Sequence, residues 1–195
     1  MKICLYQGTF NPIHKIHIEI AKFAREYYKF DKIIFILVYI PPHKSVDKSL
    51  ANHRFNMVKL AIKDFPFLNI SDIEYRIKGN SYTYNTILRI RKSLDIVDKI
   101  NFIIGTDAFE KIESWYNSDK LKDLVHFIIF PRTKSFKKEK FDYLKDKGFD
   151  FEFAPMDFRD VSSTKIRSGI KEGLSVNNYE IPQVMEYINE NNLYR

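Results

Sequence analysis

Apolar and polar positions form two alternating patterns along the chain. Short apolar runs rich in β-branched residues, bounded by polar or turn residues, are typical of strands buried in a parallel sheet. Stretches in which apolar residues recur every three or four positions are typical of helices packed on such a sheet. The predicted strands are residues 3–6, 32–39, 68–71 followed by 73–77, 100–105, 126–130 and 149–153. The predicted helices are residues 18–29, 52–63, 83–93, 107–112, 121–124, 163–172 and 182–191.

This alternation defines the expected architecture. Strand-helix units with short connections indicate an α/β protein with a doubly wound, mainly parallel sheet and helices on both faces. We expect a single domain over residues 1–195, with a C-terminal helical segment of about residues 162–195 packed on it. In such Rossmann-like folds, ligands bind at the carboxyl ends of the strands, near the point where the strand order reverses. Candidate chemistry should therefore gather just after predicted strands.

Composition narrows the class of protein. Lys and Arg total 32 against 25 Asp and Glu, a net charge of +7, which fits nucleic acid, a membrane surface or phosphorylated small molecules as partner. The lysines are scattered apart from residues 134–140, which we interpret as a solvated loop or helix face. The single cysteine, Cys4, excludes an internal disulfide. Without a membrane-length apolar segment or a signal-peptide pattern, we expect a cytoplasmic protein.

The first candidate site lies between the first predicted strand and the first helix, in residues 8–17. Gly8 permits close approach of the backbone to a ligand, and the start of the next helix presents free N–H groups and a positive dipole end to an anion. His14 and His17 are three residues apart, so both imidazoles lie on one face of the first turn. The arrangement suits a phosphate. The alternatives are a plain strand-turn-helix with solvated histidines, or a metal site, for which two ligands are too few.

A second candidate lies near the other end of the chain, in residues 160–167. Three consecutive hydroxyl residues, 162–164, precede a short helical pattern and could simply cap that helix. Lys165 and Arg167 follow in its first turn, although cations are unfavourable at a helix N-terminus. A bound polyphosphate would remove that conflict. We therefore interpret the two segments as parts of one phosphate site.

The two segments together resemble the paired signatures of the nucleotidylyltransferase superfamily. Residues 8–17 read Gly-Thr-Phe-Asn-Pro-Ile-His-Lys-Ile-His, and residues 161–167 read Val-Ser-Ser-Thr-Lys-Ile-Arg. Within the superfamily, the sequence is most similar to the bacterial nicotinate-nucleotide adenylyltransferases. Further matches follow the family's order over nearly the whole chain, in residues 40–44, 81–83, 103–107, 115–116 and 192–194. One residue departs from the pattern, because Ile16 stands where the family has glycine.

The resemblance implies an enzyme of NAD biosynthesis. Such an enzyme transfers the adenylyl group of ATP to nicotinate mononucleotide, giving nicotinate adenine dinucleotide (deamido-NAD) and pyrophosphate. No serine or cysteine paired with a base stands out, so we expect the mononucleotide phosphate to attack the α-phosphorus of ATP directly, helped by positioning and electrostatic stabilisation. We expect Mg²⁺ as cofactor, held mainly by substrate phosphates and water and not by a set of protein ligands.

The resemblance also implies roles for individual residues. The expected catalytic residues are His14, His17 and Arg167. The expected ATP-binding residues are Gly8, Thr9, Phe10, Asn11, His14, His17, Gly105, Asp107, Ser162, Ser163, Thr164 and Arg167. The residues expected at the mononucleotide are Lys44, Thr83, Trp115 and Tyr116. In the implied arrangement the indole of Trp115 stacks on the pyridine ring, while backbone N–H groups of Thr83 and Tyr116 bind its carboxylate.

Several of these residues have simpler explanations. Asp107 follows a buried strand, where an acid can accept hydrogen bonds from ribose hydroxyls, but it could also cap the next helix. Trp115 is the only tryptophan and could belong to the core. Lys44 is expected near the mononucleotide phosphate, but Lys44 and its neighbour His43 could simply be polar side chains of a surface turn. The sequence alone does not decide between these roles.

Two other functions compete with this interpretation. The first is adenylyl transfer to another phosphorylated acceptor, nicotinamide mononucleotide or phosphopantetheine; residues 81–83 and 115–116 argue against phosphopantetheine. The second is a basic nucleic-acid-binding module without activity, favoured only by the net charge and by Ile16. We expect ATP and nicotinate mononucleotide as partners, with no nucleic acid and no membrane. The sequence leaves open whether copies of the chain form a homo-oligomer.

Overall fold

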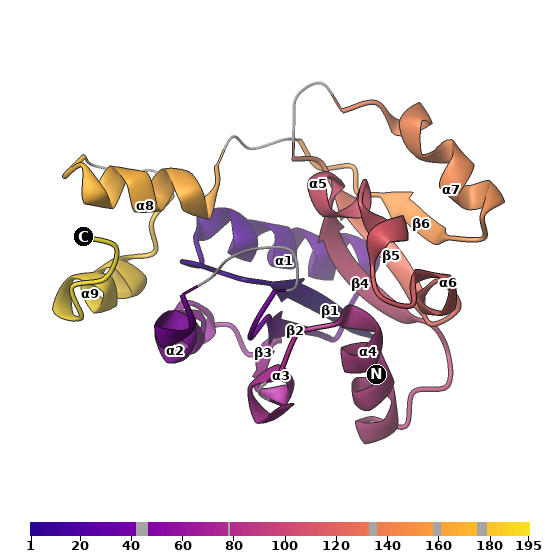
Figure 1. The fold of residues 1–195 in the computed structure, drawn as a ribbon, viewed down its shortest axis with the longest axis horizontal. Coiled ribbons are helices and arrows are strands. Elements are labelled where there is room, and N and C mark those ends of the chain that lie inside the picture. The colour runs from indigo at the N-terminus through magenta and orange to yellow at the C-terminus, as the bar shows by residue number, and fades with distance from the viewer. Residues whose placement is uncertain (42–46, 78, 133–135, 158–160, 175–178) are drawn as a thin grey trace.

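A six-stranded parallel sheet forms the centre of the molecule (Figure 1). The computed structural model describes residues 1–41, 47–77, 79–132, 136–157, 161–174 and 179–195. The strands are β1 (Ile3–Gly8), β2 (Lys32–Leu37), β3 (Leu68–Ser71), β4 (Ile100–Gly105), β5 (Val125–Phe130) and β6 (Asp150–Phe153). Their order is β3-β2-β1-β4-β5-β6, and all neighbours are parallel. The predicted doubly wound α/β fold is confirmed, with the strand order reversing between β1 and β4.

Helices connect the strands and cover both faces of the sheet. The α-helices are α1 (Lys15–Tyr28), α2 (Ala51–Ile62), α3 (Ile73–Ile77), α4 (Thr83–Ser93), α5 (Thr106–Phe109), α6 (Ser118–Leu121), α7 (Asp142–Asp146), α8 (Ser163–Lys171) and α9 (Pro182–Glu190). The described elements also include the 3₁₀ turns η1 (Lys48–Leu50), η2 (Ile112–Ser114) and η3 (Lys138–Phe141). In Figure 1, α8 and α9 lie together at one end of the molecule, and α6 and α7 lie at the other.

The sheet separates two hydrophobic cores. On one face, Tyr6 and Phe35 of the central strands are buried with residues from α1, α2, α8 and α9. On the other face, Leu5 and Phe102 are buried with residues from α4, α5, α6 and α7. Successive residues of β1 therefore point into different cores, and this explains why residues 3–6 are apolar in a row and not only at alternate positions.

Amphipathic spacing places α1 on the sheet. Ile16 and Ile20, one turn apart, are buried, whereas Glu19 between them is exposed. The helix ends at Tyr28 because Lys29 adopts a left-handed conformation with a φ of 58°. The first turn of the helix, which carries the predicted histidines, is thereby fixed against the first core.

The strand predicted at residues 73–77 is wrong, because this segment forms helix α3. The alternation of apolar and polar residues would turn Glu74 outward, but its side chain is only 3% exposed and accepts hydrogen bonds from three other segments. The helical turn is also stabilised locally, since Asp72 accepts from the backbone N–H of Tyr75 and pairs with Arg76 at 2.8 Å. Tertiary contacts therefore override the local pattern.

Three other segments differ in detail from the prediction. The helix predicted at residues 107–112 is divided into α5 and η2, and the helix predicted at residues 121–124 begins earlier, as α6. Residues 138–146, for which no element is predicted, form η3 and α7. Only Phe141 and Leu144 of these two elements are buried, in the second core, so their apolar signal is sparse. The other predicted elements are confirmed.

The C-terminal helices pack against the first core. Ile166 of α8 and Val184 and Ile188 of α9 are buried there, and α9 contacts α2. This packing brings the second predicted motif to the carboxyl ends of the strands. Among the helices of the described residues, none has the length and apolar character needed to cross a membrane.

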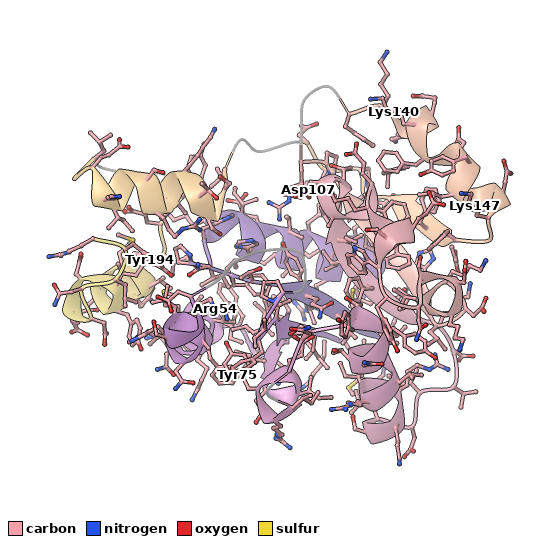
Figure 2. All side chains as sticks on the ribbon, viewed as in Figure 1. Arg54, Tyr75, Asp107, Lys140, Lys147 and Tyr194 are labelled. Atoms are coloured by element: carbon pink, nitrogen blue, oxygen red, sulfur yellow. The ribbon has the colours of Figure 1, made fainter. Side chains whose placement is uncertain are left out.

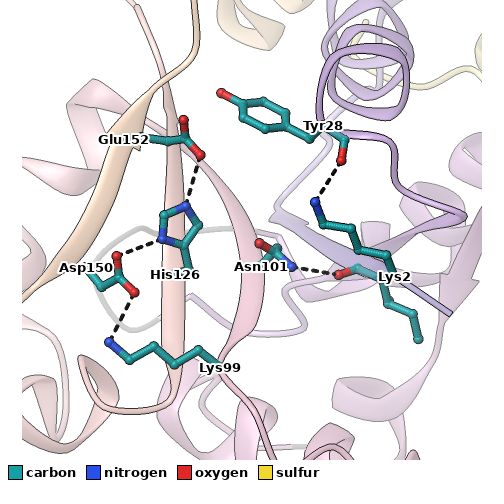
Figure 3. Close-up of polar contacts among 8 residues, drawn as sticks. Lys2, Tyr28, Lys99, Asn101, His126, Asp150 and Glu152 are labelled. Atoms are coloured by element: carbon teal, nitrogen blue, oxygen red, sulfur yellow. Dashed lines mark hydrogen bonds and ion pairs between the residues drawn. The ribbon is translucent and has the colours of Figure 1, made fainter.

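At the opposite, amino ends of the strands, His126 forms a paired polar cluster (Figure 3). Its Nδ1 lies 2.8 Å from Asp150 Oδ1, and its Nε2 lies 3.1 Å from Glu152 Oε1. Lys99 Nζ contacts the other Asp150 oxygen at 3.2 Å. Burial acts to raise the pKa of Asp150, but the hydrogen bonds from His126 and Lys99 outweigh it and the pKa is lowered. Both ring nitrogens of this histidine therefore have partners.

Candidate active site

The segment between β1 and α1 crosses the carboxyl end of the sheet beside the point where the strand order reverses. Gly8 is required by its neighbour, because a Cβ atom there would lie 2.8 Å from the Phe10 ring. Phe10 has a left-handed φ of 45°, and its buried ring packs on Tyr6 and Phe35 with centroids 5.4 and 5.2 Å apart. A non-glycine residue in that conformation costs about 1 kcal/mol. Aromatic packing thus fixes this loop.

His14 and His17 lie at the start of α1, as its N-cap and its third residue. Their rings stack with centroids 3.7 Å apart and an angle of 28° between the planes. The backbone N–H of His14 donates to Nδ1 of His17 at 3.2 Å. In a neutral ring this leaves the proton on Nε2 of His17. The two imidazoles share one side of the first turn, as their spacing predicts, and His17 offers an N–H donor.

Both imidazoles are neutral near pH 7. Burial, together with the charge of Arg132, lowers the pKa of His14 to about 3. Burial also lowers the pKa of His17 well below its usual value, with smaller contributions from His14 and Arg132. A neutral imidazole can donate a hydrogen bond but carries no charge. The histidines therefore add no positive charge to this loop, and any such charge comes from arginine and lysine side chains.

His14 is a buried polar side chain that the described part of the chain leaves unsatisfied. It is 1% exposed, and neither of its ring nitrogens has a hydrogen-bond partner among the residues that the structure describes. Leaving a buried polar group unsatisfied costs about 1–3 kcal/mol. Such groups are rare in folded proteins and often mark functional sites. A ligand oxygen would give His14 the missing partner.

Helix α8 brings the second predicted motif to this loop. Ser162 is the N-cap of α8, and its Oγ accepts a hydrogen bond from the backbone N–H of Lys165 at 3.3 Å, so this residue does cap the helix. Ser163, the first helical residue, donates from Oγ to the carbonyl of Pro12 at 2.9 Å. The start of α8 therefore touches the loop after β1 directly.

Asn11 joins the loop to the C-terminal part of the chain. Its backbone carbonyl accepts a hydrogen bond from Arg167 Nη1 at 2.7 Å, across 156 residues of sequence. Its side-chain oxygen accepts one from the Tyr194 hydroxyl at 2.6 Å. Burial raises the pKa of Tyr194, so the hydroxyl stays protonated and donates. Arg167 Nη2 also donates to Thr164 Oγ1 at 3.3 Å. The two predicted motifs are therefore in direct contact.

The end of β4 lies on the other side of the reversal point. Gly105 leaves room for two side chains, since a Cβ atom there would lie 2.6 Å from Asp107 Oδ1 and 2.8 Å from the Arg132 side chain. Asp107 is the second residue of α5, and the N-cap is Gly105, so the alternative that Asp107 caps this helix is wrong (Figure 2). The backbone N–H of Arg132 donates to Thr106 Oγ1 at 3.0 Å. Opposite charges thus flank the end of β4.

The residues expected at the mononucleotide lie around the start of α4. Thr83 is the first residue of α4, and its N-cap Tyr82 provides no side-chain cap. The backbone N–H groups of Thr83 and Tyr116 have no partner within the described residues. The Tyr116 ring packs on Tyr82 with centroids 4.7 Å apart, which brings the two segments together. Trp115 is half-buried against the second core. Lys44 lies outside the described residues.

Arg54 and Tyr194, outside the predicted set, support the loop. Arg54 of α2 is fully buried and donates to the carbonyls of three residues in two segments. These are Thr9, Val38 and Tyr39, at 3.0, 2.7 and 3.1 Å. Figure 2 shows Tyr194 above Arg54 on the α9 side of the site. No local pattern reveals either role, because the partners are distant in sequence. Arg54 lies on the buried face of α2, in line with Ala51 and Val58.

The donor set of the site suits an anion. It combines imidazoles, hydroxyl groups, free backbone N–H groups at helix starts, and the guanidinium groups of Arg167 and Arg132. Helix starts and arginines are common ligands of phosphate groups. Within the described ranges, no group of three or more His, Cys, Asp or Glu residues could hold a metal ion. These donors gather at the switch point of a doubly wound sheet, and their chemistry suits a phosphorylated ligand.

Comparison with known proteins defines the class. The family model described as cytidylyltransferase-like matches residues 5–169. This chain belongs to the cytidylyltransferase-like family. The matched range begins inside β1 and ends inside α8, so it contains both segments that meet at Asn11.

Curated relatives narrow the class further. A probable nicotinate-nucleotide adenylyltransferase of Caldicellulosiruptor saccharolyticus is 35% identical over 199 residues, covering 100% of both chains. Another, from Clostridium botulinum, is 39% identical over 196 residues and covers 96% of each chain. Within its class, the chain is thus a member of the nicotinate-nucleotide adenylyltransferase family. The family predicted from the two motifs is confirmed.

A solved structure shares the fold. The nicotinic acid mononucleotide adenylyltransferase of Plasmodium falciparum complexed with NaAD matches with a TM-score of 0.82. The match covers 99% of this chain and 97% of that chain, at 23% sequence identity. At 23% identity the similarity shows a common fold and gives no information on individual side chains.

Proposed function

We propose that this protein transfers the adenylyl group of ATP to nicotinate mononucleotide, forming nicotinate adenine dinucleotide and pyrophosphate in NAD biosynthesis. One observation carries the proposal: two side chains of α8, Ser163 and Arg167, donate to backbone carbonyls of the loop after β1 at 2.9 and 2.7 Å. Two helix starts therefore face the same place, as binding of a triphosphate requires. The names of the curated relatives support nicotinate mononucleotide as the acceptor.

The triphosphate of ATP binds where α1 and α8 begin. His14 and His17 donate hydrogen bonds to oxygens of the α- and β-phosphates. Arg167, with the hydroxyl groups of residues 162–164, holds the β- and γ-phosphates. Because the imidazoles are neutral, they contribute directed donors, and the arginines neutralise charge. Binding gives the buried His14 ring a partner, so part of the affinity comes from relieving an existing desolvation cost.

The adenosine part of ATP lies toward the end of β4. Asp107 accepts hydrogen bonds from ribose hydroxyls, which is the usual role of an acid near the switch point of such sheets. Gly105 leaves this strand end without a side chain of its own. The loop backbone at Thr9 and Phe10 contributes further N–H donors toward the nucleotide.

The mononucleotide binds at the start of α4. Its nicotinate carboxylate accepts hydrogen bonds from the backbone N–H groups of Thr83 and Tyr116, two donors without partners in the described chain. The indole of Trp115 stacks on the pyridine ring, and Lys44 binds the phosphate. Two N–H donors fit a carboxylate better than a carboxamide, whose NH₂ group would meet no acceptor there. Nicotinate is therefore favoured over nicotinamide.

The reaction is an in-line displacement. An oxygen of the mononucleotide phosphate forms a bond to the α-phosphorus, and the bond from that phosphorus to the oxygen bridging to the β-phosphate breaks. Pyrophosphate leaves with the electron pair, and no covalent enzyme intermediate forms. The chain contributes by aligning the two substrates and by directing N–H donors at the oxygens on which charge develops.

We also propose Mg²⁺ as the cofactor. The N–H and O–H donors of the site fit phosphate oxygens and leave other phosphate oxygens for a cation. Mg²⁺ keeps several waters and is commonly held by substrate phosphates with few protein ligands. When bound, it would neutralise part of the charge on the leaving pyrophosphate.

Measurement of pyrophosphate and dinucleotide release tests the proposal. Purified protein is incubated with ATP, Mg²⁺ and one acceptor: nicotinate mononucleotide, nicotinamide mononucleotide, phosphopantetheine or none. We expect the fastest release with nicotinate mononucleotide and none without acceptor or without Mg²⁺. Faster release with either other acceptor would change the assigned substrate. No release with any acceptor would contradict adenylyl transfer.

A further inference from the structure

A buried carboxylate lies behind the proposed mononucleotide site. Glu74 of α3 is 3% exposed and accepts hydrogen bonds from neutral groups on three other segments. These are Gln7 Nε2 at 2.5 Å, the Tyr39 backbone N–H at 3.2 Å and Thr86 Oγ1 at 2.9 Å. No Lys, Arg or His side chain of the described residues pairs with it. Burial raises the pKa of this carboxyl group, and the hydrogen bonds offset part of the rise.

Gln7 transmits the position of this carboxylate to the start of α4. While its Nε2 donates to Glu74, its Oε1 accepts a hydrogen bond from Thr83 Oγ1 at 2.7 Å. Both carboxyl oxygens of Glu74 accept hydrogen bonds, so the amide nitrogen of Gln7 faces Glu74 and its amide oxygen faces Thr83. The Thr83 side chain is therefore held in one orientation by Gln7, which Glu74 holds in turn.

The same carboxylate holds the exit of β2. Tyr39, which donates to Glu74, also donates to Ser81 Oγ at 2.9 Å, and Ser81 returns a backbone hydrogen bond to the Ile40 carbonyl at 2.8 Å. Ser81 lies two residues before Thr83, so the exit of β2 is tied to the segment that enters α4. Two segments next to the start of α4 thus converge on one side chain.

We propose that Glu74 is a positioning residue for the mononucleotide: through Gln7 and Thr86 it holds the first turn of α4, whose N–H groups receive the nicotinate carboxylate. This inference rests on the proposed function. Glu74 does not contact the substrate. The first turn of α4 has no acidic residue and no side-chain cap, so its N–H groups stay open to an anion while the hydrogen bonds behind them fix its direction.

Substrate binding by single and double variants tests this role. Trp115 is the only tryptophan, so its fluorescence reports binding of nicotinate mononucleotide without turnover. We expect Glu74→Gln and Gln7→Leu each to raise the Kd and KM for the mononucleotide about tenfold, since each breaks a buried hydrogen bond. The KM for ATP and kcat should stay within about twofold of the parent, because ATP binds elsewhere. The Kd of the double variant for the mononucleotide should be no higher than that of the single variant with the higher Kd, because both substitutions break the same link.

A matched carboxylate gives the control. Asp72, two residues before Glu74, is half-exposed and pairs with Arg76 on the surface at 2.8 Å. Asp72→Asn should leave both KM values unchanged. If Glu74→Gln does not fold, Thr86→Val and Gln7→Leu are measured with the same criterion, because each removes one donor to Glu74 and keeps the carboxylate.

The outcomes separate the two proposals. Binding by the parent protein with unchanged Kd in the variants overturns the role of Glu74 and leaves the proposed function intact. Equal increases in KM for both substrates also overturn it, because they indicate that the whole fold has loosened. Additive effects in the double variant overturn it as well, because they indicate that Glu74 and Gln7 act independently. If the parent itself does not bind nicotinate mononucleotide, the proposed function fails, and the role of Glu74 fails with it.

Discussion

Histidines occupy both ends of the sheet, and their surroundings differ. At the amino ends, His126 has a carboxylate oxygen at each ring nitrogen, 2.8 and 3.1 Å away (Figure 3). At the carboxyl ends, His14 stacks on His17 with centroids 3.7 Å apart, and neither of its ring nitrogens has a partner in the described chain. Both ring nitrogens of His126 are satisfied within the fold, whereas the ring nitrogens of His14 are not satisfied by any of the described residues.

This difference separates polar groups that stabilise the fold from polar groups that serve a ligand. A partly exposed pair such as His126 with Asp150 contributes at most about 1 kcal/mol. A buried imidazole without a partner lowers stability. A fold retains such a cost at sites where a ligand will later satisfy the group. Five substitutions test whether the contrast holds, and they are ordered from the largest expected effect to the smallest.

Replacement of His17 should produce the largest change. His17→Ala removes an N–H donor aimed at the triphosphate, so we expect kcat to fall by about 10²–10⁴. The variant should still fold and melt cooperatively, at a lower temperature, because a buried ring and its hydrogen bond from His14 are removed. His126→Ala, the matched change at the other end of the sheet, should keep normal turnover. Near-normal turnover of His17→Ala would show that His17 is not a catalytic residue. The histidines at the carboxyl ends of the strands would then not differ in function from His126.

Arg167→Lys should have the next largest effect. The planar guanidinium donates to Asn11 and Thr164 at once, and an ammonium group cannot reproduce that geometry. We expect kcat/KM for ATP to fall about tenfold to 100-fold. Arg89→Lys, at an exposed position on α4, is the control and should behave like the parent. Equal activity of the two variants would show that only charge matters at position 167.

Trp115 tests whether the contrast extends to aromatic side chains. Trp115→Ala should raise the KM for nicotinate mononucleotide about tenfold, because stacking on the pyridine ring is lost, and should change kcat less. Tyr28→Phe, at the opposite end of the sheet, removes a hydroxyl without a partner among the described residues and should change neither constant. An unchanged KM in Trp115→Ala would place the indole in the core only.

The protonation of His14 gives a pH-dependent prediction. Its pKa is about 3 in the folded protein, against about 6.5 in an unfolded chain. Below about pH 6.5 the unfolded chain binds a proton that the folded chain refuses, so stability falls as the pH falls. At about pH 5 the protonation of His14 in the unfolded chain should lower the free energy of unfolding by about 2 kcal/mol. Urea unfolding of His14→Asn should show a correspondingly smaller loss between neutral pH and pH 5. A loss equal to that of the parent would contradict a buried neutral ring.

The smallest effect is expected at His126. His126→Gln keeps some hydrogen bonding but not the paired geometry, so the free energy of unfolding should fall by at most about 1 kcal/mol. Turnover should not change. A large loss of activity would show that the two ends of the sheet are coupled, and the contrast between them would then be wrong.

Much of the fold could be predicted because its signals are local. The strands Ile100–Gly105 and Val125–Phe130 are nearly continuous apolar runs, since both faces of the sheet are covered. Helix Thr83–Ser93 has clear apolar spacing, with Ile87 and Ile90 buried. Helix α3 could not be predicted, because the burial of Glu74 depends on groups supplied by distant segments.

The site could be predicted in part for the same reason. His14, His17 and Arg167 belong to contiguous motifs that resemble those of the family, so these residues could be singled out from the sequence, and their roles stay predictions. Arg54, Tyr194 and the link from Glu74 through Gln7 act by contacts between distant segments, and no local pattern carries that information. The expected position of Lys44 stays a prediction, because the residue lies outside the described part of the chain.

The contacts of Asn11 set an order of events during synthesis. The loop after β1 leaves the ribosome early, but the side chains that hold it follow 156 and 183 residues later. A growing chain can therefore pair its first two strands long before Arg167 and Tyr194 are available to hold the loop after β1. A product cut short before Arg167 would carry all six strands but neither of the side chains that hold the loop at Asn11.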